Sequence, residues 1–67
     1  MLDFSKMILS KVSFDPLLFH KELRKLILWI GDDLDEINCL HEWCEENYGE
    51  LYGEIIAEEF KDYGRYD

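Results

Sequence analysis

The sequence predicts an all-α fold, a small bundle of three to four short helices that forms a single domain over residues 1–67. Apolar residues recur at spacings of three and four along the whole chain, which is typical of amphipathic helices. No segment alternates apolar and polar residues as a half-buried strand would. Three of the four glycines stand where a helix is expected to end. The expected helices cover residues 3–12, 16–30, 33–48 and 50–63.

The first expected helix, residues 3–12, carries its apolar side chains mainly on one side, with Lys6 and Ser10 on the other. We therefore expect that apolar side to face the core. Its residues are Phe4, Met7, Ile8 and Val12.

The second helix, residues 16–30, has the clearest start. Asp15 can cap it, Pro16 suits the first helical position, and Phe14 can pack on Phe19 as a hydrophobic staple. Gly31 is expected to stop it in a left-handed conformation. One stripe of this helix is predicted to lie in the core, and it consists of Phe19, Leu23, Leu26, Ile27 and Ile30.

The third helix is expected to begin after Asp33, which can cap it in a box with Glu36, and to end near Tyr48. A last helix would then reach Tyr63, where Gly64 can cap it. A single helix from Asp33 to Tyr63 is the alternative, but its two apolar stripes would differ in direction by about 110°. We therefore predict a break at Gly49. The expected core residues are Ile37, Leu40, Cys44 and Tyr48, followed by Tyr52, Ile55, Ile56, Phe60 and Tyr63.

Composition and size indicate a folded protein with little stability to spare. Hydrophobic residues make up 48% of the chain, more than a disordered acidic segment would contain. A domain of this size buries only about 60% of the surface of its unfolded chain, so self-association would help it. The longest apolar run, Leu26 to Ile30, cannot span a bilayer, and no signal peptide is apparent. We expect a soluble cytoplasmic protein.

The formal net charge of −9 is unevenly distributed. Residues 1–30 carry five basic and three acidic side chains, whereas residues 31–67 carry two basic and thirteen acidic ones. This charge repels nucleic acid phosphate and anionic lipid, so we expect no direct binding to nucleic acid or to a membrane. A basic partner is electrostatically easier to bind.

The stretch CLHEWC, residues 39–44, contains both cysteines and one of the two histidines. On a helix the Cα atoms of Cys39 and Cys44 would lie roughly 8.6 Å apart, too far for a disulfide. We expect Cys44 to be a small buried apolar side chain and His41 to lie at the boundary of the core. No paired zinc-knuckle motif is present, so no metal or other cofactor is predicted.

No catalytic residues are predicted, because no pair of carboxylates can be singled out and so small a domain has little room for a substrate pocket. The apolar residues, by contrast, exceed what one stripe per helix would bury. Either the second helix is contacted on two sides, or the surplus forms a contact patch. The predicted protein interface consists of Leu17, Leu28, Trp29 and Trp43, with Leu18 beside them.

We therefore expect a small non-catalytic cytoplasmic protein that acts by binding another protein or a second copy of itself. One alternative is an acidic decoy or inhibitor of a nucleic-acid-binding protein, which the acidic second half would support. Another is a metal- or thiol-dependent activity at His20, His41 and Cys44.

Overall fold

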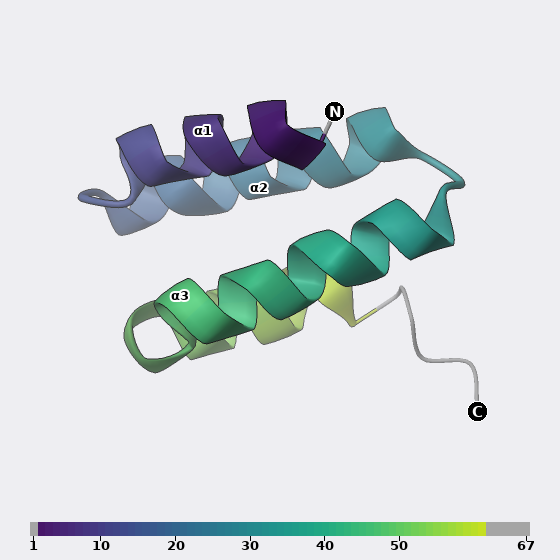
Figure 1. The fold of residues 1–67 in the computed structure, drawn as a ribbon. Coiled ribbons are helices and arrows are strands. Elements are labelled where there is room, and N and C mark those ends of the chain that lie inside the picture. Colours follow the sequence, from purple (N-terminus) through teal and green to yellow (C-terminus); the bar gives the residue numbers. More distant parts are fainter. Residues whose placement is uncertain (1, 62–67) are drawn as a thin grey trace.

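The computed structural model describes residues 2–61, which form three packed α-helices (Figure 1). They are α1 (Leu2–Val12), α2 (Pro16–Ile30) and α3 (Leu34–Phe60). No strand occurs within these residues, so the predicted all-helical class is confirmed. The bounds of α1 and α2 lie within one residue of those expected from the sequence.

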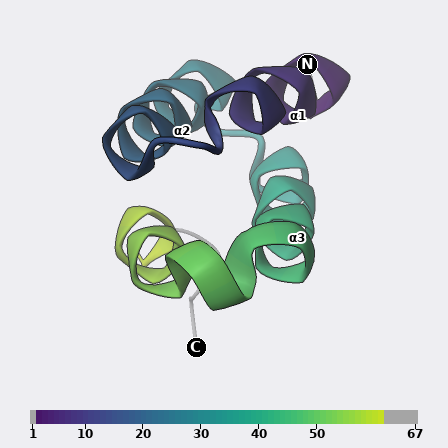
Figure 2. The same ribbon diagram turned by 90° about the vertical axis from the view of Figure 1, so that its left-hand side faces the viewer.

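The third helix is divided by a kink at Tyr52, whose φ of −125° and ψ of 32° are not helical. The chain folds back there, so that the first arm (residues 34–51) and the second arm (residues 53–60) run side by side (Figures 1 and 2). The unbroken helix considered as an alternative is therefore wrong, and so is the break expected at Gly49. The predicted end at Tyr63 and the Gly64 cap lie outside the described residues.

The kink lies at Tyr52, directly before Gly53, and a tertiary contact accompanies it. Glycine is tolerated inside a helix at a cost of about 1 kcal/mol, so Gly49 alone does not force a break. The Tyr52 side chain is buried, and its hydroxyl donates a hydrogen bond of 2.5 Å to the backbone carbonyl of Ser13, in the turn after α1. This bond joins the bend of α3 to the turn between α1 and α2.

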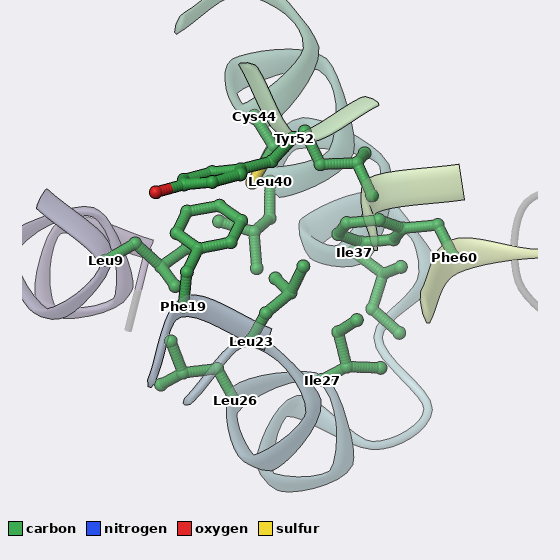
Figure 3. Packing of buried hydrophobic residues seen from close by; sticks show 11 residues of the cluster. Leu9, Phe19, Leu23, Leu26, Ile27, Ile37, Leu40, Cys44, Tyr52 and Phe60 are labelled. Carbon is green, nitrogen blue, oxygen red and sulfur yellow. The ribbon is translucent and has the colours of Figure 1, made fainter. Parts of the chain in front are cut away.

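The molecule has two layers, with α1 and α2 in one layer and the two arms of α3 in the other (Figure 2). The core lies between the layers and receives side chains from every helix (Figure 3). Most of the stripes expected on α2 and α3 are buried, whereas Ile30, Tyr48 and Ile55 are only partly so. The buried hydrophobic residues are Leu9, Phe19, Leu23, Leu26, Ile27, Ile37, Leu40, Cys44, Tyr52, Ile56 and Phe60.

The face that α1 buries matches the predicted one only in part, since Ile8 and Val12 pack against the core as expected. Phe4 and Met7 are exposed, whereas Ser5 and Leu9 are fully buried. The prediction chose the largest apolar side chains, but α1 packs against both α2 and α3. The small side chain of Ser5 suits a position where helices approach closely, and it is followed one turn later by Leu9. The buried face of α1 is therefore set by its contacts with α2 and α3 and not by hydrophobicity alone.

The helix ends are mostly built as expected. The carboxylate of Asp15 accepts hydrogen bonds from the amides of Leu17 and Leu18, at 3.0 and 3.4 Å. Asp33 accepts one from the amide of Glu36 at 3.1 Å. Gly31 ends α2 as expected, and its amide donates to the carbonyl of Ile27, but its φ of 74° and ψ of −117° favour glycine without being the left-handed helical conformation that was predicted. The expected staple is wrong, because Phe14 is 77% exposed.

Candidate functional site

Two exposed leucines mark the outward face of α2. Leu17 is 79% exposed and Leu28 is 65% exposed. They lie eleven residues apart, which places them about three turns or 16 Å apart along the axis and within about 20° of the same direction. Both line one shallow and open surface hollow formed by α2 residues alone, so the structure brings together two of the four predicted interface residues.

Basic side chains occupy the same hollow between the leucines. Lys21 and Arg24 share its lining with His20 and Lys25. Lys25 forms an ion pair with Glu22 at 3.5 Å. Within residues 2–61, no carboxylate lies at ion-pair distance from Lys21 or Arg24. The hollow therefore combines apolar ends with positive charge that the described part of the chain does not neutralise.

Trp29, the third predicted interface residue, is 67% exposed and leans toward α1. Its ring meets the ring of Phe4 edge-on, with centroids 5.8 Å apart and planes at 88°. The exposed apolar surface thus continues from α2 onto α1 through Phe4. Sequence reasoning missed this contribution because it assigned Phe4 and Met7 to the core.

Trp43, the fourth predicted interface residue, is only partly exposed. It packs against the core, meets Tyr48 edge-on at 5.5 Å, and has the Lys6 ammonium 5.9 Å from its ring centroid. The two tryptophans contact different residues of α1, since Trp29 meets Phe4. The structure therefore separates Trp43 from the other three interface residues, and most of its apolar contact is made within the molecule.

The residues of CLHEWC diverge as expected for a helix. Cys39 is exposed and Cys44 is fully buried, and both are free thiols. Burial, with a smaller contribution from the nearby carboxylate of Glu45, raises the pKa of Cys44 to about 12. A thiol that resists ionisation to this degree is a poor nucleophile and a poor metal ligand at neutral pH.

Both histidines hold the second arm of α3 in place. The His41 ring stacks on Phe60, with centroids 4.4 Å apart and planes at 4°, and its Nε2 lies 3.4 Å from a carboxylate oxygen of Glu45. His20 on α2 contacts the largely buried carboxylate of Glu59. Among residues 2–61, no three His, Cys, Asp or Glu side chains are grouped so that they could hold a metal ion. The geometry gives no support to a joint site of His20, His41 and Cys44.

The outer surface of α3 carries a row of carboxylates. Five exposed glutamates follow one another at intervals of four residues, the spacing of neighbours on a helix surface. The kink at Tyr52 divides the row, so three lie on the first arm and two on the second. They are Glu42, Glu46, Glu50, Glu54 and Glu58.

Known protein families, curated proteins and solved structures give no match to this chain. The function of its surface is therefore inferred from the side chains that form it. Within residues 2–61, none of the three helices combines the length and apolar character that a bilayer-spanning helix requires.

Proposed function

We propose that this is a small non-catalytic cytoplasmic protein that acts by binding another protein through the exposed face of α2. The observation that carries the proposal is the exposure of large apolar side chains on one short helix, which is greatest for Leu17, Leu28 and Trp29. Apolar side chains rimmed by charge are typical of protein interfaces. We name these three residues, together with Phe4, the apolar face.

Trp29 is the residue that we expect to contribute most to the binding free energy. Tryptophan and arginine are enriched among the residues that dominate protein interfaces, and a ring already held against Phe4 loses little freedom on binding. Trp43 is not part of this proposal, because its ring packs against the core.

Affinity capture with chemical crosslinking tests the proposal. We expect that wild-type protein captures a partner from its native host, and that Leu28→Ser and Trp29→Ala each weaken the capture at least tenfold, as hot-spot residues do. Leu51→Ser is the matched control, because Leu51 is 68% exposed but lies on α3. Equal capture by wild type and both α2 variants would rule the apolar face out.

Sedimentation of the same variants separates self-association from binding to a different protein. If the partner is a second copy, wild type sediments as a dimer at micromolar concentration, and Trp29→Ala sediments as a monomer. The glutamate row favours the alternative of an acidic decoy for a nucleic-acid-binding protein. That alternative predicts capture of basic proteins that is lost at high salt and in Glu42→Gln/Glu46→Gln, but is retained in Leu28→Ser.

A further inference from the structure

We propose that the hollow of α2 between Leu17 and Leu28 binds an acidic amphipathic helix of another protein. The inference rests on the proposed function and adds the chemistry of the partner. The hollow is lined by both leucines and by His20, Lys21, Arg24 and Lys25. A complementary surface needs apolar side chains opposite its two ends and carboxylates opposite its middle.

The spacing of the leucines indicates a helical partner. Leu17 and Leu28 face the same way over three helical turns, and Lys21 and Arg24 fall one and two turns after Leu17. A second helix packed alongside repeats its side chains with the same period, so two of its apolar residues eleven positions apart would meet both leucines. Its residues four and seven positions after the first would then face the basic pair.

The charges on this face select an acidic partner. Lys21 and Arg24 are exposed and have no ion-pair partner within residues 2–61. The glutamate row lies on α3, in the other layer of the molecule (Figure 2). At physiological ionic strength the screening length is about 8 Å, so the net charge of −9 acts weakly across the molecule, and contacts inside the hollow dominate.

The α3 helix of a second copy does not fit the hollow. Its large exposed apolar side chains are Leu34 and Leu51. Both lie on the first arm of α3, seventeen residues apart, and they point in directions that differ by about 100°. They therefore cannot contact Leu17 and Leu28 together. The α2 helix of a second copy has two leucines at the required spacing, but it would place Lys21 and Arg24 against basic side chains, so the proposed partner is a different protein.

A synthetic helical peptide tests the proposal. The probe is an alanine-rich, fluorescein-labelled peptide with two leucines eleven positions apart and glutamates four and seven positions after the first leucine.

We expect wild-type protein to bind this peptide saturably, as measured by fluorescence anisotropy. Leu28→Ser should weaken it about tenfold or more, because one buried leucine contributes that factor to a binding constant. Lys21→Glu/Arg24→Glu should weaken it similarly and should instead bind the same peptide with lysines in place of the glutamates.

Lys11→Glu and Leu51→Ser are the controls, since both residues are exposed and neither lines the hollow. Each should bind the acidic peptide as wild type does. The proposal is overturned if wild type does not bind the peptide at about 1 mM, or if it binds the lysine peptide equally well. It is also overturned if phosphatidylserine vesicles bind wild type but not Leu28→Ser while the peptide does not bind. If the peptide fails but Leu28→Ser still abolishes capture from the host, the partner chemistry is wrong and the proposed function stands.

Discussion

Cys44 illustrates how position decides the chemistry of a residue. As a residue type it suggests redox or metal chemistry, but helical spacing already placed it on the inner stripe with Ile37 and Leu40. The structure confirms its burial, and burial disfavours the thiolate. Cys39, five residues earlier on the same helix, is exposed. The sequence was sufficient to separate the two thiols.

The raised pKa of Cys44 makes stability depend on pH in the alkaline range. The thiol titrates near 9.0 ordinarily and near 12 in the folded protein, so above about pH 9 only the unfolded chain releases this proton. Rising pH therefore favours unfolding, by up to about 1.4 kcal/mol per pH unit between these values. We expect the free energy of unfolding of wild type to fall relative to that of Cys44→Ala when urea denaturation is repeated from pH 8 to pH 10.5.

The control for this pH series is Ile37→Val, another buried apolar position without a titratable group. It should lose about 1 kcal/mol relative to wild type, and by the same amount at every pH. A difference between wild type and Cys44→Ala that is equally constant would contradict the burial of the thiol.

The kink of α3 is the element whose position the sequence did not predict. The phase of the apolar stripes indicated that the helix must change direction, which is correct. A glycine seemed the natural place for the change, but the chain bends three residues later, where Tyr52 leaves helical geometry. The contact that accompanies the bend joins residues 39 positions apart. Local propensity cannot reveal such a partner.

Tyr52→Phe tests the importance of that contact. Removal of the hydroxyl deletes the hydrogen bond to the Ser13 carbonyl but keeps the buried ring, so we expect a loss of about 1 kcal/mol in the free energy of unfolding. Tyr48→Phe is the matched control, because its hydroxyl lies 3.5 Å from the exposed Ser10 hydroxyl and should contribute much less. Thermal and urea unfolding measure both. Equal losses would show that the bond does not specifically stabilise the bend.

At the scale of the whole molecule, charge is divided between the layers. The layer of α1 and α2 contains five basic residues, Lys6, Lys11, Lys21, Arg24 and Lys25, whereas α3 is dominated by carboxylates. This separation was visible in the sequence as a contrast between residues 1–30 and 31–67. Only the two-layer arrangement shows that the two charge regions form two faces of opposite charge on one small domain.

The glutamate row of α3 is expected to destabilise the protein at low salt. Like charges four residues apart on a helix cost about 0.2–0.5 kcal/mol per pair, and Glu46 has such neighbours in Glu42 and Glu50. Glu46→Lys replaces two repulsions by attractions, so we expect a gain of about 1 kcal/mol in the free energy of unfolding. Urea denaturation at low ionic strength measures it, and the gain should shrink as salt is added. Glu46→Gln, which only removes repulsion, should give about half the gain; no gain in either variant would contradict the prediction.

The sequence by itself determined the helical class, the caps at Asp15 and Asp33, and the inner stripes of α2 and α3, because hydrogen bonding near a helix end and the 3.6-residue period are local properties. Only the tertiary structure decided which face of α1 is buried, where α3 bends, and that Trp43 packs against the core while Trp29 and Leu28 are exposed. Hydrophobicity indicates that a side chain favours burial. Whether burial is available depends on which helices lie against it, and those helices are distant in the chain.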